Sequence, residues 1–316
     1  SASDLTSGTL ADARFPATLP AISGANLTNL PITPAGTADF VASGTLPNGK
    51  PVVLKADGTV EVVGEGVLSF GASSTFTSNT PLDIRVSFDP NNADRFVIIY
   101  RPYSSTKHTT AIAGTISGTT ITFGTPVALT SHNTEWTDLT FDPNNAGKFV
   151  VVYRHGASGE AIVGTLAGTA ISFGTAVAFD SGSAVYIAAA FDPNNSGKFL
   201  VTFRDSTSGK AIVGTVSGTS ISFGSSYTFN TGEPSYTSIS FDPNTAGKFV
   251  IAYKDNGNSG YGTAIVGTIS GTTLSFGTKV VFKSSTSNWT SIAFDPNTAG
   301  VFVVVWKAYH GEAIVG

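Results

Sequence analysis

The sequence of 316 residues contains neither cysteine nor methionine. The lack of cysteine excludes disulfides, thiolate metal sites and a cysteine nucleophile. Charged residues make up only 12% of the chain, about half the usual quarter. The 17 Lys and Arg residues form no basic run and are outnumbered by 21 Asp and Glu, so we expect no nucleic-acid partner. No apolar run approaches the roughly 18 residues of a membrane span, so we expect no membrane insertion.

An internal repeat is the main signal of the sequence. The motif Phe-Asp-Pro-Asn occurs five times, about 50 residues apart, beginning at Phe88, Phe141, Phe191, Phe241 and Phe294. Each copy introduces four strand-like runs separated by turn signals, which in the second copy are residues 136–141, 148–154, 160–166 and 171–179. Four antiparallel strands repeated at this interval are typical of a β-propeller, in which each blade covers the faces of its neighbours.

The two ends of the repeat region complement each other. The last repeat stops after its third strand at Gly316, whereas residues 67–71 (VLSFG) match fourth strands such as residues 171–174 (ISFG). The predicted fold is therefore all-β: a five-bladed β-propeller of four-stranded blades, closed into a ring by an N-terminal strand, residues 67–76, which completes the blade of residues 289–316. The alternative is that a longer parent chain continues past Gly316.

The sequence predicts three regions along the chain. Residues 1–35 carry few charges and cannot form a core, so we expect an extended anchor or trimerisation connector. Residues 36–64 read as a small β meander, with turns at residues 47–49 and 57–58. Residues 65–316 form the propeller.

The loops of the repeat predict two different faces of the disc. The turns after the Phe-Asp-Pro-Asn motif hardly vary, and an Asp before Pro ordinarily caps such a turn through its own backbone. We favour this structural role over a calcium site, which requires more oxygen ligands than one turn supplies. All the variation in loop length lies on the opposite face, which is the usual arrangement for binding.

Aromatic and basic residues gather on this variable face. Five positions before each repeated Phe, four blades have a Trp or Tyr and one has an Asp, and an Arg or Lys follows each second strand. Aromatic faces beside hydrogen-bonding groups suit the stacking and hydroxyl recognition of a sugar, although the aromatics could also serve only as packing between blades. The candidate ligand-binding residues are Trp136, Tyr186, Tyr236, Trp289, Arg101, Arg154, Arg204, Asp83 and Asp138.

Metal and catalytic sites are not expected. The four histidines lie in the variable loops without the spacing of metal ligands, and no cofactor motif is present. Glycoside hydrolysis would require two carboxylates with separated pKa values, for which Asp83 and Asp138 are the candidates on innermost strands. Because nearly identical blades argue against one asymmetric catalytic centre, we predict that the protein is not an enzyme and keep a propeller glycosidase as an alternative.

Two parts of the chain resemble known fibre proteins. Residues 4–10 (DLTSGTL), 13–21 (ARFPATLPA) and 23–27 (SGANL) resemble the connector of bacteriophage tail-fibre and related virion fibre proteins. Residues 40–63 and the repeat FDPNNAGKFVVVYR of residues 141–154 are similar to segments of fibre-like structural proteins of marine phages. In architecture alone, five blades are similar to tachylectin-type lectins, without their sequence motifs.

The resemblance implies a virion protein whose N-terminal part attaches or trimerises and whose distal domain touches the host. The leading hypothesis is a virion fibre or receptor-binding protein that recognises a host cell-surface glycan through the variable face. Other virion proteins would contact residues 1–64, a homo-oligomer, in particular a trimer, is expected, and the location would be the virion. The second hypothesis is a structural or decoration protein whose propeller packs against neighbouring subunits.

Overall fold

The computed structural model describes residues 41–42, 52–54, 58–62, 70–103 and 108–316. The chain divides into two compact units, residues 1–69 and 70–316, close to the predicted boundary between residues 64 and 65. The predicted anchor of residues 1–35 and the predicted turn at residues 47–49 lie outside the described residues. No helix within the described ranges is long and apolar enough to cross a membrane.

The first unit contains a small three-stranded sheet of β1 (Val41–Ala42), β2 (Val52–Leu54) and β3 (Thr59–Val62). The strands β2 and β3 form the expected antiparallel hairpin, in which Gly58 has a φ of 83°. However, β1 pairs in parallel with β3, so the strand order is β1-β3-β2. The prediction of a meander is therefore wrong in strand order: the short turn fixes only the β2–β3 pair, and β1 adds to the other edge of β3.

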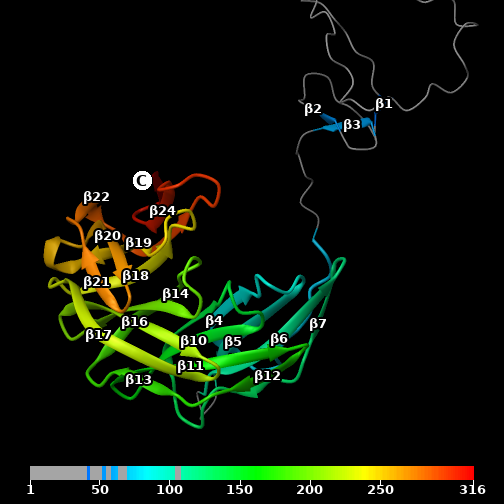
Figure 1. Ribbon diagram of the computed structural model, residues 1–316, viewed down its shortest axis with the longest axis horizontal. Coiled ribbons are helices and arrows are strands. Elements are labelled where there is room, and N and C mark those ends of the chain that lie inside the picture. Colours follow the sequence, from blue (N-terminus) through cyan, green and yellow to red (C-terminus); the bar gives the residue numbers. More distant parts are fainter. Residues whose placement is uncertain (1–40, 43–51, 55–57, 63–69, 104–107) are drawn as a thin grey trace, which may run out of the picture. The chain divides into compact units, whose positions relative to one another are not determined.

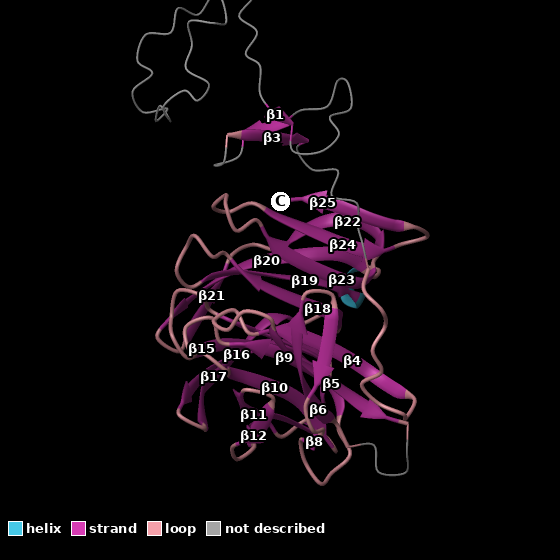
Figure 2. Ribbon diagram, turned by 90° about the vertical axis from the view of Figure 1, so that its right-hand side faces the viewer, coloured by secondary structure: helices cyan, strands magenta, loops and turns pink. Residues whose placement is uncertain are grey.

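The second unit confirms the five-bladed β-propeller: five antiparallel sheets follow one another around a common centre (Figures 1 and 2). Blade one comprises β4 (Pro81–Phe88), β5 (Arg95–Pro102), β6 (Thr110–Ser117), β7 (Thr120–Phe123) and β8 (Val127–Ala128). Blade two comprises β9 (Glu135–Phe141), β10 (Lys148–His155), β11 (Ser158–Ala167), β12 (Ala170–Phe173) and β13 (Val177–Asp180). Blade three comprises β14 (Ala184–Phe191), β15 (Lys198–Asp205), β16 (Ser208–Ser217) and β17 (Ser220–Asn230). Blade four comprises β18 (Pro234–Phe241), β19 (Lys248–Asp255), β20 (Tyr261–Ser270), β21 (Thr273–Phe276) and β22 (Val280–Thr286), with a 3-10 turn η4 (Asn256–Asn258). Blade five comprises β23 (Asn288–Phe294), β24 (Phe302–Lys307) and β25 (Gly311–Val315).

The second strand of each inner blade is covered on both faces, as its unbroken apolar sequence predicts. In β10, residues 149–153 are all buried. Val151 and Tyr153 pack toward blade one, whereas Val150 and Val152 pack toward blade three. The hydrophobic core is thus a series of layers between successive blades, and each layer requires both neighbours.

The repeated Phe-Asp-Pro-Asn motif joins one blade to the next. One carboxylate oxygen of Asp142 accepts the backbone N–H of Asn144 at 2.9 Å, and the other accepts the N–H of Gly197 in the next blade at 3.1 Å. The side-chain amide of Asn144 also donates to the carbonyl of Pro193 at 3.1 Å. We call these contacts the interblade clasp. They support the structural role of the motif, since the carboxylate oxygens already accept hydrogen bonds from the protein.

The fourth strand of blade five is the part of the predicted ring that the described pairings do not include. Within the described ranges, β25 pairs only with β24, and the sheet of blade five has three strands. Residues 67–69 of the predicted closing strand lie outside the described residues, and residues 70–76 contact blade one through Ser74 and Phe76. The five blades are confirmed, and their closure by the N-terminal strand stays a prediction.

Candidate functional site

A β-bulge interrupts the innermost strand of every blade. In β9, Trp136 and Thr137 lie opposite the single residue Tyr153 of β10, and the other four blades have the same shift of register. The first residue of each bulge has a left-handed backbone, with φ between 49° and 56°: Asp83, Trp136, Tyr186, Tyr236 and Trp289. This conformation costs a residue other than glycine about 1–2 kcal/mol. The retention of large side chains at these strained positions points to a use for those side chains.

The bulges bring the four predicted aromatics into one continuous row. Ring centroids lie 4.6 Å apart between Trp136 and Tyr186, 5.3 Å apart between Tyr186 and Tyr236, and 4.7 Å apart between Tyr236 and Trp289. The side chains at the two ends of the row remain accessible, with Trp136 38% and Trp289 64% exposed. All four aromatics lie inside the innermost strands, because the strand continues through the bulge on both sides of them.

Hydrogen bonds between blades hold the row in place. The hydroxyl of Thr237 donates to the carbonyl oxygen of Tyr186, and the hydroxyl of Thr290 donates to that of Tyr236. Each threonine is the second residue of its own bulge and reaches the first residue of the preceding bulge. The two central residues of the row, Tyr186 and Tyr236, are therefore fixed by their neighbours, which keeps their rings oriented in advance of any ligand.

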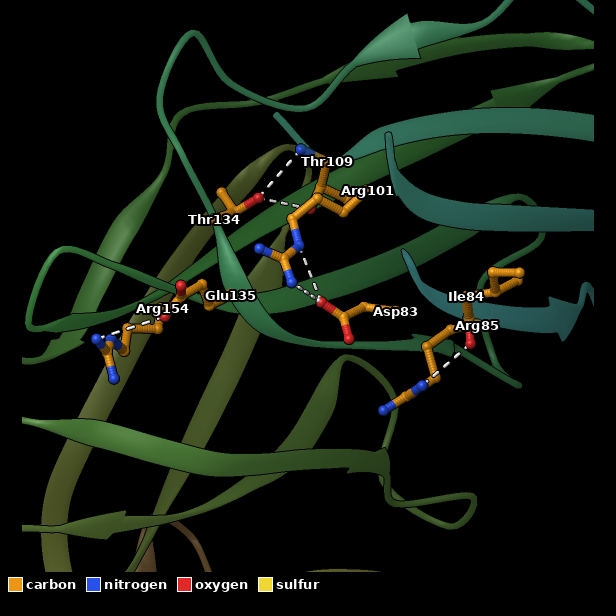
Figure 3. A network of polar contacts seen from close by, with 8 residues as sticks. All are labelled: Asp83, Ile84, Arg85, Arg101, Thr109, Thr134, Glu135 and Arg154. Atoms are coloured by element: carbon orange, nitrogen blue, oxygen red, sulfur yellow. Dashed lines mark hydrogen bonds and ion pairs between the residues drawn. The ribbon is translucent and has the colours of Figure 1, made fainter. Parts of the chain in front are cut away.

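Blade one has an ion pair where the other blades have an aromatic ring. The guanidinium of Arg101 donates to one carboxylate oxygen of Asp83 through Nε at 2.9 Å and through a terminal nitrogen at 2.5 Å (Figure 3). The Asp83 side chain is 41% exposed, so the pair presents a carboxylate to solvent. The fivefold repeat is thus broken at one position, which gives the site a polar side.

The other two predicted basic residues, Arg154 and Arg204, contact residues of the site. The Arg154 guanidinium lies 3.4 Å from the carboxylate of Glu135 and donates through Nε to the carbonyl of Gly156 at 2.7 Å. The Arg204 guanidinium lies over the ring of Tyr186, 5.0 Å from its centroid. Arg154 and Arg204 line neither of the two central cavities, whereas Arg101 lines one of them. Arg154 and Arg204 therefore act as positioning residues for Glu135 and Tyr186.

Asp138 forms an interblade contact with Arg85, a residue that the sequence analysis did not select. The Asp138 carboxylate accepts the N–H of Ala189 at 2.9 Å, and Nε of Arg85 lies 3.7 Å from its other oxygen. Burial raises the pKa of Asp138, while the N–H of Ala189 and the charge of Arg85 partly oppose that rise. The sequence held a signal for Arg85: it occupies the repeat position of Asp138, where the remaining blades have Ala188, Ser238 and Ser291.

Two adjoining cavities lie at this centre. The first, of about 380 Å³, is lined by Asp83, Arg85, Arg101, Glu135, Trp136, Thr137 and Trp289. The second, of about 230 Å³, is lined by Arg85, Trp136, Tyr186, Ile187, Tyr236, Thr237, Trp289 and Thr290. Together they combine aromatic faces, guanidinium donors and carboxylate acceptors, the groups that bind the C–H faces and the hydroxyls of a sugar. Two lining residues, Glu135 and Thr137, were not among the candidate ligand-binding residues. Glu135 is the only charged residue at its repeat position, which is a sequence signal, whereas Thr137 matches Thr237 and Thr290 and gives none.

The histidines do not assemble into a metal site in the part of the chain that the structure describes. The rings of His132 and His155 stack with centroids 4.5 Å apart, and Nδ1 of His155 lies 3.1 Å from a carboxylate oxygen of Glu160. No cluster of three or more His, Cys, Asp or Glu side chains is arranged to hold a metal ion within the described ranges.

Comparison with known proteins adds information on the fold. No protein-family model and no curated protein matches this chain. Among solved structures, a functionally unknown protein from Desulfotomaculum acetoxidans is 12% identical with a TM-score of 0.51, covering 71% of this chain and 64% of that one. Sqt1 from Saccharomyces cerevisiae is 12% identical with a TM-score of 0.53, covering 76% of this chain and 60% of Sqt1. The chain thus spans less than two thirds of the length of either protein, and the likeness shows the propeller fold alone.

Similar structures also correct one prediction. An exo-β-1,3-galactanase from Bifidobacterium bifidum is 10% identical with a TM-score of 0.46, covering 71% of this chain and 80% of the enzyme. A second exo-β-1,3-galactanase and a sialidase are also among the similar structures. The prediction that this protein is not an enzyme is contradicted: it rested on nearly identical blades, yet Asp83, Arg85 and Glu135 make the centre asymmetric, and enzymes are among the proteins with similar structures. These likenesses assign no reaction to this chain.

Proposed function

We propose that the centre of the propeller is a carbohydrate-binding site. The observation that carries this proposal is the row of four aromatic side chains, held at left-handed bulges and exposed at Trp136 and Trp289. Packing alone does not require this arrangement, because a ring that served only to fill space between blades would be buried. An aromatic face open to a cavity offers stacking to the apolar face of a pyranose.

The polar wall of the larger cavity supports the same ligand class. Asp83 and Glu135 supply hydrogen-bond acceptors, while Arg85 and Arg101 supply donors. Charges of both signs lie on this wall, so the site does not select for a polyanion or a polycation. A neutral or weakly charged sugar, whose hydroxyls both donate and accept, matches this mixture.

The test is binding of the full chain to a broad glycan panel, compared with the variant Trp136→Ala/Trp289→Ala. Tyr309→Ala is the matched control, because Tyr309 is an aromatic on the same loop face that is 92% exposed and lines neither central cavity. We expect the double variant to lose binding and the control to keep it. Equal binding by all three proteins would exclude the central site, and release of sugar products during the assay would reveal a glycosidase.

The likeness of residues 4–27 to virion fibre connectors supports a wider proposal. The protein would be a fibre or receptor-binding component of a virion, attached to other virion proteins through residues 1–64 and presenting the propeller to a host-surface glycan. The proposal includes assembly into a trimer, which would multiply weak single-site affinity. Light scattering of the full chain tests this assembly: a mass three times that of the 32.4 kDa chain is expected, and a monomer would contradict it.

A further inference from the structure

Within the described residues, blades one and five each have a face without a neighbouring blade (Figure 1), and apolar side chains are exposed on both faces. In blade one, Val86 is 59% and Phe88 is 54% exposed, whereas the corresponding residues of blade two, Leu139 and Phe141, are 7% and 5% exposed. In blade five, Val305 is 43% exposed, although its counterparts in the second strands of the inner blades are buried. These two faces are the ones that would meet if the ring closed. We call the space between them the seam.

Residues 70–76 contact blade one as a fourth strand contacts the blade that follows it. The ring of Phe76 lies 5.3 Å from that of Tyr100 in blade one. The same contact joins Phe229 at the end of blade three to Tyr253 of blade four, also at 5.3 Å. Residues 70–76 therefore already make a contact that a fourth strand makes with the blade that follows it.

A glycine in the same segment repeats a second contact. A Cβ placed on Gly71 would lie 2.2 Å from the carbonyl oxygen of Thr119, in the outer turn of blade one. The corresponding distance from Gly124, in the fourth strand of blade one, to Thr169 of blade two is 2.3 Å. Close approach of backbone to backbone requires glycine at both positions. Gly71 thus lies where the fourth strand of a preceding blade would place it.

A fourth strand also pairs with the third strand of its own blade, and on blade five no described strand pairs with the free edge of β25. In blade two, Gly164 of β11 pairs with Phe173 of β12, whose ring lies 6.0 Å from that of Phe149. Gly316 adjoins Phe302 in the same way, since a Cβ on Gly316 would lie 2.3 Å from that ring. The equivalent distance from Gly164 to Phe149 is 2.0 Å. Blade five therefore has the glycine and the second-strand phenylalanine of this arrangement, and within the described ranges nothing pairs with β25 on that side.

An apolar cavity lies where the phenylalanine of a fourth strand would pack on blade five. It measures about 370 Å³, lies between blades four and five, and its lining includes Val280, Phe282, Phe302, Ile314 and Gly316. In the preceding interface of blades three and four, the ring of Phe276 fills the corresponding place and lies 6.3 Å from Phe229 and 6.1 Å from Phe249. The repeat equivalent of Phe276 is Phe70, which is 90% exposed.

We propose that residues 70–76 form the fourth strand of blade five by pairing with β25, with Phe70 opposite Gly316 and Thr75 opposite Glu312. Phe70 then fills the cavity between blades four and five, while Phe76 keeps its contact with Tyr100. The N–H of Gly71 donates to the carbonyl of Val315, as the N–H of Gly174 donates to that of Val163 in blade two. One short segment thus binds the last blade and the first, and it closes the seam.

Closure also affects the candidate site. The five left-handed residues belong to five blades, and Asp83 of blade one and Trp289 of blade five are the two that face each other across the seam. Asp83 and Arg101 already line one cavity with Trp289 at the free end of the aromatic row, and closing the ring would hold these residues at a fixed spacing. The inference itself rests on strand register and packing, and it stands independently of what the centre binds.

The test uses disulfide trapping in the full chain, which contains no cysteine of its own. The variant Thr75→Cys/Glu312→Cys joins the proposed pair, because residues directly opposite each other in antiparallel strands are within the reach of a disulfide. Lys210→Cys/Thr228→Cys is the positive control, since Lys210 and Thr228 are the observed pair at this position in blade three. Thr75→Cys/Ile314→Cys is the control for register, as it shifts one partner by two residues.

Non-reducing electrophoresis and mass spectrometry after mild oxidation distinguish the outcomes. We expect the proposed pair to form an intrachain disulfide as completely as the positive control, and the shifted pair to form at least tenfold less. Disulfides only between chains would show that a second copy supplies the strand, which would overturn the proposal. Absence of a disulfide in the proposed pair, with a disulfide in the positive control, would overturn it as well.

Discussion

The two faces of the propeller differ in how far the fivefold repeat is kept. On one face, Asp142 and its counterparts are nearly identical in every blade and satisfy backbone N–H groups within and between blades. On the other, the bulge residues share a strained backbone but differ in side chain, with four aromatics and Asp83. A left-handed backbone at a non-glycine residue thus occurs at all five bulges, whereas in the turns of the clasp it occurs only at Asp94, because the other four blades have glycine at that position. The positions that hold the ring together are therefore separate from those of the proposed binding site.

The largest expected effect is on recognition. Trp136→Ala/Trp289→Ala should weaken glycan binding by about 100-fold, equivalent to about 2.7 kcal/mol, because it removes both exposed stacking faces. Its free energy of unfolding should change little, since neither side chain is buried. Calorimetric titration and urea denaturation of the same protein measure the two quantities. A large loss of stability with unchanged affinity would reverse the roles of the two faces.

The next effect is on stability through the interblade clasp. Asp142→Ala leaves the N–H groups of Asn144 and Gly197 without their acceptor and should lower the free energy of unfolding by about 2–4 kcal/mol. Asp180→Ala is the matched control, because the Asp180 carboxylate accepts the N–H of Gly182 in its own turn at 3.0 Å and no described hydrogen bond ties it to another blade. Urea denaturation should show a clearly smaller loss for the control, and equal losses would contradict the clasp.

A smaller effect isolates the strain itself. Trp289→Gly should be more stable than Trp289→Ala by about 0.5–1 kcal/mol, the left-handed penalty of about 1–2 kcal/mol less the larger unfolded-state entropy of glycine. The same two substitutions at Tyr309, which does not have a positive φ, should give the opposite order. Thermal and urea denaturation of the four variants check this. If glycine is no better than alanine at residue 289, the bulge stores no strain.

The smallest expected effect concerns Asp138 and pH. Burial raises its pKa in the folded protein above the unfolded value of about 3.8, so the folded state binds the proton more tightly. This group therefore lowers stability above its folded pKa, and the penalty disappears as the pH falls below 3.8. Asp138→Asn, which keeps an acceptor for the N–H of Ala189, should stabilise the protein slightly at pH 7 and not at pH 3. Denaturation at the two pH values tests the difference, and a gain confined to pH 3 would contradict the sign.

Much of the fold followed from the sequence because the repeat is explicit. The spacing of Phe-Asp-Pro-Asn predicts blades, and the unbroken apolar second strands predict layers with two covered faces, as residues 149–153 show. The order of the small sheet did not follow, because nothing in three short strands distinguishes the two edges of β3 for the addition of β1.

The sequence predicted which types of residue form the site, but it did not predict their backbone conformation or their arrangement. The aromatics were found by comparing blades, but their left-handed conformation has no sequence signal when the residue is Trp or Tyr in place of Gly. Arg101 and Arg154 occupy the same repeat position, yet only Arg101 reaches the cavity, because Asp83 draws it inward while Glu135 and Gly156 hold Arg154. Such differences depend on neighbours in three dimensions, which the repeat alone does not specify.

Tryptophan fluorescence during a sugar titration tests the central claim most directly. Of the three tryptophans in the chain, Trp136 and Trp289 line the cavities, whereas Trp306 is 5% exposed and packs in the core of blade five. Addition of the glycan selected by the panel should give a saturable change in emission that is lost in Trp136→Phe/Trp289→Phe, which keeps Trp306. A change that persists in this variant, or binding without any change in the unaltered chain, would place the ligand away from the centre of the ring.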